Sequence, residues 1–260
     1  MNRSKILLKI GGKAFDGESA YQELAQEQLL LKDIAFIIVH GGGAEISQAL
    51  KAANRQSVFV DGLRVTSAED IAIVEQVLSG TINERIARLL SRNGLSCRRL
   101  SGKTEGLLLV EPMRRNGKDL GFVGRIKQVN PSPVLESLNQ HRVPIISPIS
   151  ADEAGDSYNV NADSAAAAIA SACQCAGLIY FTDVPGVKVG DKILSQINYS
   201  QAKKLIADGV IKDGMIAKLE SAFEALLNHV PWVHITSWQG PGTLRNLIER
   251  RAKSGTTIYG

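Results

Sequence analysis

Cysteine is scarce in this sequence, and long apolar runs are absent from it. The three cysteines, Cys97, Cys173 and Cys175, are odd in number and too few for a disulfide scaffold. No apolar run approaches the ~18 residues that span a bilayer. The run Ile6–Leu8 is also far shorter than the ~7–15 residues of a signal-peptide core. We therefore expect a reduced, cytoplasmic protein that has no membrane partner.

Neither sign of charge dominates, since 30 Lys and Arg residues against 26 Asp and Glu residues give a net charge of +4. The basic residues are scattered, without blocks interleaved with aromatic residues, so nucleic acid is not an expected partner. With 44% apolar and 22% charged residues, the composition excludes disorder, collagen and coiled coil as descriptions of the whole chain. The 260 residues suffice for one large α/β unit or two small lobes, with no room for a sizeable regulatory domain.

Short apolar runs alternate with longer segments of helical periodicity along the chain. The apolar runs predict strands at 6–10, 35–39, 96–100, 106–110, 143–147, 177–183 and 232–237. The periodic segments predict helices at 18–32, 44–53, 68–93 (with a break at Ser79-Gly80), 162–176, 199–208, 215–228 and 242–253. Such alternation forms βαβ units, and strands that are apolar on both faces lie between two helical layers. The predicted fold is α/β, a three-layer αβα sandwich with a mainly parallel, continuous central sheet.

Glycines follow the first two predicted strands, as Gly11-Gly12 and as Gly41-Gly42-Gly43. In a parallel sheet the carboxyl ends of the strands meet at one edge, where ligands bind. Glycine lets the backbone approach an anion, and a helix that follows offers free N–H groups. Neither loop matches the P-loop or dinucleotide-binding patterns. Each loop taken alone is equally well explained as a tight turn between strand and helix.

Three further features carry charge or amide groups. Lys9 lies near the end of the first predicted strand, where a buried lysine needs an anion, although an edge lysine that reaches solvent and the neighbouring Lys13 are alternatives. Asn159, Asn161 and Asp163 occupy alternate positions of an extended segment and can share one face, although Asn161 or Asp163 could also be a helix N-cap. Lys218 lies one turn into a helix, a position more typical of a solvated charge.

Ten segments together resemble the amino-acid kinase superfamily, and within it the acetylglutamate kinase family. They lie in order along nearly the whole chain, at 9–12, 40–43, 61–66, 100–103, 121–124, 144–149, 159–163, 182–187, 208–218 and 255–258. The Gly-Leu-Arg-Val-Thr sequence at 62–66 and the Asn-x-Asn-Ala-Asp sequence at 159–163 distinguish this branch from other kinases of the superfamily.

The resemblance implies ATP-dependent phosphorylation of the side-chain carboxylate of N-acetyl-L-glutamate, an early step of arginine biosynthesis. It implies that residues 1–173 form a lobe for acetylglutamate binding and dimerisation, and that 174–260 form an ATP-binding lobe. It also implies a homodimer, and the short segment before the first strand favours a dimer insensitive to arginine. Mg²⁺ is expected on the phosphates and water, with no protein ligand, because no carboxylate cluster is evident.

The resemblance also assigns roles to single residues. The implied catalytic residues are Lys9, Lys218, Asp163, Gly12 and Gly43. The implied substrate-binding residues are Gly42, Gly43, Arg64, Asn159 and Asn161. The implied nucleotide-binding residues are Lys9, Gly11, Thr182, Asp183, Gly186, Ile211, Met215 and Lys218. A carboxylate nucleophile is already ionised at pH 7, so catalysis depends on positioning and positive charge rather than on a general base.

Other kinases of the superfamily and a regulator without catalysis are the competing hypotheses. An aminoadipate-type kinase is the hardest to exclude, whereas the presence of both Lys9 and Lys218 disfavours a regulator that only binds. We interpret His40 as a structural hydrogen-bonding residue, and we place Cys173 and Cys175 in a helix, facing apart. The basic segment 112–119 receives no role.

Overall fold

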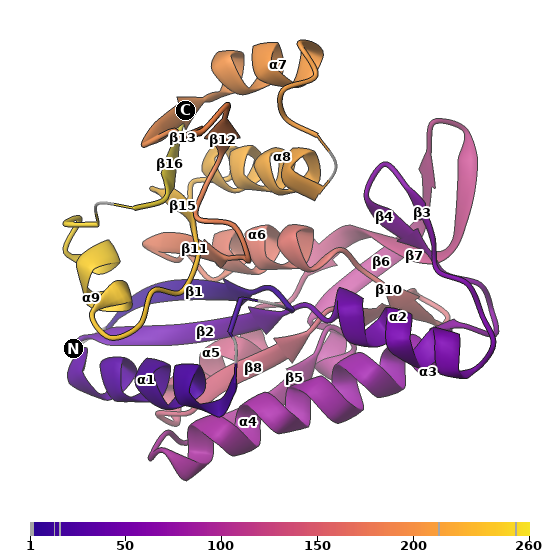
Figure 1. Cartoon of the computed structure of the whole chain (residues 1–260). Coiled ribbons are helices and arrows are strands. Elements are labelled where there is room, and N and C mark those ends of the chain that lie inside the picture. Colours follow the sequence, from indigo (N-terminus) through magenta and orange to yellow (C-terminus); the bar gives the residue numbers. More distant parts are fainter. Residues whose placement is uncertain (1–2, 13, 16, 213, 253) are drawn as a thin grey trace.

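An eight-stranded sheet forms the centre of the computed structural model, which describes residues 3–12, 14–15, 17–212, 214–252 and 254–260 (Figure 1). In spatial order its strands are β14 (Gln196–Asn198), β16 (Thr256–Tyr259), β15 (Val233–Thr236), β11 (Gly177–Phe181), β1 (Ser4–Ile10), β2 (Ile34–His40), β8 (Val143–Ser147) and β5 (Cys97–Ser101). All neighbouring pairs are parallel except β15 and β16. The sheet therefore runs without interruption through both halves of the chain, and the predicted parallel sheet is confirmed.

Helices cover both faces of this sheet and confirm the three-layer sandwich. One face packs against α1 (Gly17–Leu30), α2 (Gly43–Ala52), α4 (Asn83–Arg92) and α9 (Thr243–Ile248). The other face packs against α5 (Ser132–Asn139), α6 (Ala162–Ala172), α7 (Tyr199–Ala207) and α8 (Gly214–Leu227).

The alternation of side chains along β1 assigns Lys9 to one of these faces. Ile6, Leu8 and Ile10 belong to the core beneath α1 and α4, whereas Leu7 belongs to the core beneath α6 and α8. Because successive side chains of a strand point to opposite faces, Lys9 shares the face of Leu7. It therefore points toward α6 and α8.

A second, smaller sheet and two hairpins lie beyond the central sheet. The strands β6 (Leu108–Arg115), β7 (Lys118–Val129), β9 (Ile149–Ala151) and β10 (Ser157–Asn159) close on one another. The hairpins join β3 (Val58–Val60) to β4 (Leu63–Val65) and β12 (Lys188–Val189) to β13 (Lys192–Ile193). The sequence predicted only the start of β6, because these strands are short or half-exposed and lack a continuous apolar run.

Three predicted helices need correction. The break predicted at Ser79-Gly80 is absent, because a π-helical segment at Gln76–Ile82 joins α3 (Ile71–Glu75) to α4 without interruption. The helix predicted at 162–176 ends at Ala172, since Gln174 has a φ of 52°. Cys173 and Cys175 therefore do not face apart on one helix, and both are buried in the core. The last helix, α9, ends at Ile248 rather than at 253.

Among the described residues, no helix combines the length and the apolar composition that crossing a membrane requires.

Candidate active site

A cavity of about 210 Å³ opens at the carboxyl edge of the central sheet. The glycine loops after β1 and β2, the β3–β4 hairpin and the segment between β10 and α6 surround it. Of the residues that the sequence singled out, the cavity is lined by Lys9, Gly12, Gly42, Gly43, Arg64, Asn159, Asn161 and Asp163. The topology thus brings together residues that lie more than 150 positions apart in the chain.

Asp163 lies between the two predicted lysines. Its Oδ1 is 2.8 Å from Lys9 Nζ and its Oδ2 is 2.9 Å from Lys218 Nζ. All three residues are only 7% exposed, so the alternative of a solvated edge lysine at Lys9 is wrong. One carboxylate compensates one of two cationic charges, and the cluster keeps a net positive charge in a buried position.

The pKa values of this cluster follow from burial and from the neighbouring charges. Burial alone would raise the pKa of Asp163, but the charges of Lys9 and Lys218 outweigh that effect and hold it well below its usual range. Burial lowers the pKa of Lys218, and the nearby Asp163 opposes this shift. Asp163 is consequently an anion across the physiological pH range and remains a fixed partner for both ammonium groups.

Asn161 is the N-cap of α6, as one of the alternatives proposed. Its Oδ1 accepts hydrogen bonds from the backbone N–H of Asp163, at 2.8 Å, and of Ser164, at 3.1 Å. The three residues do not share one extended strand, because β10 ends at Asn159 and Asp163 lies in the first turn of α6. All three nevertheless line the cavity, since the turn at the cap keeps them on its wall.

The second glycine loop is packed so closely that a side chain would not fit at Gly42. A Cβ atom there would overlap the Ile82 side chain and lie 2.9 Å from Leu78 Cδ2, and both of these residues belong to the π-helical segment. Gly42 also precedes α2, which has no side-chain cap. The free N–H groups of the first turn of α2 therefore offer a site for negative charge at the cavity wall.

Arg64 is held in place by three hydrogen bonds. Its Nη2 donates to Gly43 O at 2.8 Å and to Ser47 Oγ at 2.9 Å, and its Nη1 donates to Ser57 Oγ at 2.5 Å. The guanidinium carbon lies 4.7 Å from the centre of the Phe59 ring. Since a guanidinium has five N–H donors, two remain for a ligand in the cavity.

Five of the residues predicted to bind nucleotide lie after β11, in α8 or in the segments that follow them or lead to them, outside the cavity lining. Thr182 and Asp183 follow β11, and Met215 lies one turn before Lys218 in α8. Neither these three residues nor Gly186 and Ile211 line the 210 Å³ cavity, whereas Lys9 does line it. The charge of Asp183 raises the pKa of Lys218, so the two groups are within electrostatic reach. Lys13 and Asp213 lie outside the described residues.

A buried hydrogen-bond network behind the glycine loop escaped the sequence analysis. His40 Nδ1 lies 3.0 Å from Gly41 O, and its Nε2 lies 3.2 Å from Asn83 Nδ2. Asn83 also donates to Ile145 O at 2.8 Å and accepts from Arg99 Nε at 3.1 Å. Burial lowers the pKa of His40 to about 4, so this residue is a neutral structural group, as expected. The signal for Asn83 in the sequence was one polar residue within an apolar helical pattern.

The basic segment 112–119 forms the tip of the β6–β7 hairpin. Arg115 pairs with Asp61 at 3.4 Å and with Glu220 at 3.5 Å, and Asn116 Nδ2 donates to Asp61 Oδ2 at 2.7 Å. The tip thus joins the turn beside Arg64 to α8, the helix of Lys218. In the described part of the chain, no three His, Cys, Asp or Glu side chains gather as metal ligands would.

The sequence of this chain is similar to those of known proteins. The model of the amino acid kinase family matches residues 4–237. The chain is 40% identical over 229 residues to an acetylglutamate kinase of Ruegeria pomeroyi, covering 86% of this chain and 78% of that protein. It is 37% identical over 267 residues to an acetylglutamate kinase of Methanothrix thermoacetophila, covering 98% of this chain and 92% of that protein.

Solved structures share the fold over the whole chain. The protein smu.665 of Streptococcus mutans superposes with a TM-score of 0.82 at 28% identity, and the match covers 98% of both chains. N-acetylglutamate synthase of Neisseria gonorrhoeae gives a TM-score of 0.85 at 22% identity, covering 99% of this chain and 62% of that one. The second likeness concerns the fold alone.

Proposed function

The chain belongs to the amino acid kinase family, and from this premise we infer that it phosphorylates N-acetyl-L-glutamate with ATP. The product is N-acetyl-L-glutamyl 5-phosphate, an intermediate of arginine biosynthesis. One observation carries the proposal most directly: the buried Lys9–Asp163–Lys218 cluster adjoins a cavity that Arg64 lines. The identity of 36–40% to acetylglutamate kinases over most of the chain supports the same substrate.

The proposed reaction transfers one phosphoryl group between two anions. An oxygen of the substrate side-chain carboxylate attacks the γ-phosphorus of ATP, the bond to the bridging oxygen breaks, and ADP leaves with that electron pair. No proton has to move, so the main obstacle is repulsion between the carboxylate and the phosphate. Lys9 and Lys218 would oppose this repulsion from two sides, and Asp163 would keep both ammonium groups aligned.

The glycine loops would stabilise the charge that develops on the phosphoryl oxygens. Gly12, after β1, and Gly42 and Gly43, at the start of α2, line the cavity, and the helix dipole of α2 also favours negative charge there. A positioned donor of this kind typically contributes about 3–4 kcal/mol to transition-state stabilisation. Gly11 would let the nucleotide phosphates approach the backbone, since it carries no side chain. A Cβ there would also lie only 3.1 Å from Phe181 O of β11.

Arg64 would bind the α-carboxylate of the substrate with an N–H group that its three hydrogen bonds leave free, and a lysine ammonium could not make all of these bonds at once. Asn159 and Asn161 would bind the acetamido group or the same carboxylate. Thr182, Asp183, Gly186, Ile211 and Met215 would line the ATP site, next to Lys218.

Mg²⁺ is the expected companion of ATP. The described residues fit an ion held by phosphates and water, because they offer no group of three carboxylate or other ligands. The bound ion would supply further positive charge to the phosphates. The chain's own part is to hold the phosphoryl group between Lys9 and Lys218.

We also propose that residues 1–173 bind acetylglutamate and carry a homodimer interface, whereas residues 174–260 bind ATP. The 210 Å³ cavity supports the first assignment, because all of its described lining residues lie between Lys9 and Asp163 in the sequence. Sedimentation at micromolar concentration should give a dimer, and a hexamer would contradict this assembly.

A hydroxamate assay tests the reaction. The purified chain, ATP, Mg²⁺, N-acetyl-L-glutamate and hydroxylamine should yield an acyl hydroxamate, and none above the enzyme-free background would refute the proposal. The same assay with N-acetyl-L-2-aminoadipate tests the competing substrate. A higher kcat/KM for this longer acid would reassign the substrate while leaving the kinase chemistry intact.

A further inference from the structure

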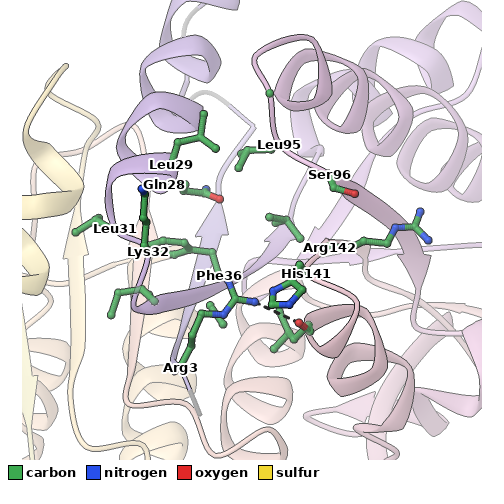
Figure 2. Close-up of a pocket in the computed structure, with 15 residues that line it drawn as sticks. Arg3, Gln28, Leu29, Leu31, Lys32, Phe36, Leu95, Ser96, His141 and Arg142 are labelled. Carbon is green, nitrogen blue, oxygen red and sulfur yellow. Dashed lines mark hydrogen bonds between the residues drawn. The ribbon is translucent and has the colours of Figure 1, made fainter. Parts of the chain in front are cut away.

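A second cavity, of about 380 Å³, lies at the opposite edge of the central sheet, where β1, β2 and β8 begin (Figure 2). β1 has seven residues, so the two edges are separated by about 20 Å. The apolar part of the cavity wall includes Leu31, Phe36 and Leu95. Its volume falls in the range of small-molecule sites in proteins.

Four basic residues line this cavity. They are Arg3, Lys32, His141 and Arg142. None of the described lining residues is acidic. Within the described ranges, none of the four forms an ion pair. The described residues that line the cavity therefore contribute positive charge and no carboxylate to neutralise it.

Backbone carbonyls fix the two arginines. Arg3 Nη2 donates to Leu138 O at 3.2 Å, the bond that Figure 2 draws. Arg142 donates from Nε and Nη2 to Cys97 O, at 3.3 and 2.9 Å. These contacts leave the charge and several N–H donors of both guanidinium groups available, although the Arg142 side chain points away from Arg3 in Figure 2 and also borders a neighbouring pocket beside β5.

Gln28 provides an independent observation. It lines the cavity from α1 and is only 5% exposed. Among the described residues, neither its Oε1 nor its Nε2 has a hydrogen-bond partner. A buried amide without partners is costly, and most such groups in native proteins are satisfied by protein, water or ligand. A water molecule could satisfy the amide, but it would not neutralise the surrounding cations.

We infer that this cavity binds a small organic anion. Its carboxylate would be attracted by the positive charge of the basic residues that line the cavity, Arg3 first, and its apolar body would pack on Leu31, Phe36 and Leu95. An amide-type group on the same molecule would donate to and accept from Gln28. The inference does not depend on the proposed function, because the cavity shares no residue with the active site.

N-acetyl-L-tryptophan is a suitable probe, since it combines a carboxylate, an amide and an apolar ring. Its neutral counterpart, N-acetyl-L-tryptophanamide, keeps the amide and the ring and lacks the charge. In isothermal titration calorimetry the acid should bind once per chain, at least tenfold more tightly than the neutral compound. Absence of saturable binding, or equal affinity for both compounds, would overturn the inference. So would displacement of the acid by saturating N-acetyl-L-glutamate, which would place it in the other cavity.

Two variants locate the probe. Gln28→Leu removes the amide at similar volume and should weaken binding of the acid at least fivefold. Lys32→Ala combined with His141→Asn alters exposed residues only, and Asn tolerates the φ of 56° at position 141. This double variant should bind N-acetyl-L-tryptophan at least fivefold more weakly and should bind the neutral amide with unchanged affinity.

Arg88→Ala is the matched control, because Arg88 is exposed on α4 and does not line the cavity. It should bind the acid like the unaltered chain. Unchanged binding in the double variant, or an equal loss in Arg88→Ala, would show that the probe binds elsewhere or without specificity.

Discussion

The two edges of the central sheet differ in whether a carboxylate neutralises their basic side chains. At the carboxyl edge, Lys9 and Lys218 share Asp163 and are almost fully buried. At the amino edge, Arg3 and Lys32 stand with two further basic residues around a cavity that has no acidic lining residue among those described. A built-in carboxylate holds the two ammonium groups together, and under the proposed function they would meet a phosphoryl group that arrives and leaves. Without such a carboxylate, the counter-charge has to come from a bound molecule or from solvent.

The largest expected effect on turnover concerns the two lysines of the carboxyl edge. Lys9→Arg and Lys218→Ala should each lower kcat at least about 100-fold, because the first displaces a positioned charge and the second removes one from the transition state. KM for N-acetyl-L-glutamate should change far less in steady-state assays. Lys51→Ala, an exposed lysine on α2, is the control and should leave both constants unchanged. A loss confined to KM would mean that the lysines only bind substrate.

Asp163→Asn tests the carboxylate that distinguishes this edge. The variant leaves two buried ammonium groups without their shared partner, which typically costs about 3–5 kcal/mol of unfolding free energy. Urea unfolding should show this loss together with a reduced kcat. Asp156→Asn, at an exposed position, provides the comparison and should unfold like the unaltered chain. Equal unfolding free energies of the two variants would show that the Lys9–Asp163–Lys218 cluster does not stabilise the fold.

The pH dependence of stability offers a third test, since His40 lies behind the carboxyl edge. Its folded pKa of about 4 is below the unfolded value of 6.5. The unfolded state therefore binds more protons between these values, and stability is full above pH 6.5 and falls as the pH drops toward 4. The shift corresponds to about 3 kcal/mol.

Urea unfolding at pH 7 and pH 4.5 should therefore differ more in the unaltered chain than in His40→Gln. If the unfolding free energy changed with pH equally in both proteins, His40 would not be the cause of the change. Asp163 adds a loss at lower pH, as the pH falls below its unfolded pKa of about 3.9 toward its depressed folded value.

Arg64→Ala addresses substrate binding at the same edge. Loss of a guanidinium that binds a carboxylate should raise KM for N-acetyl-L-glutamate at least about tenfold, because charged hydrogen bonds contribute roughly 1.5–3 kcal/mol. The value of kcat should fall less, and KM for ATP should stay nearly constant. An unchanged KM for the amino acid would remove Arg64 from the site.

The smallest effect is expected at the amino edge. Gln28→Leu replaces a buried amide that has no described partner by an apolar group, so the unfolding free energy should stay within about 1 kcal/mol or increase. Thermal unfolding without ligand measures this change. A loss above that range would reveal that the amide is already well satisfied in the free protein.

The family resemblance of the sequence predicted more of the site than its apolar periodicity did. Apolar runs ending in glycine located the two loops at the carboxyl edge, and the structure confirms both. Lys218 had no signal of its own and was selected only through the family resemblance. Asn83 and the π-helical segment were missed, because their role depends on His40 and Gly42, which are distant in the sequence.

The sequence by itself determined the layered parallel sheet, because apolar periodicity records which side of each element is buried. It also determined the sheet edge that carries the glycine loops. Only the tertiary structure decided that Asp163 meets Lys218, 55 residues away, and that Gln28 is buried in the wall of a cavity that Arg3 and Lys32 also line. Periodicity reports the burial of a segment along its own chain, whereas charge compensation and hydrogen bonding depend on neighbours in space.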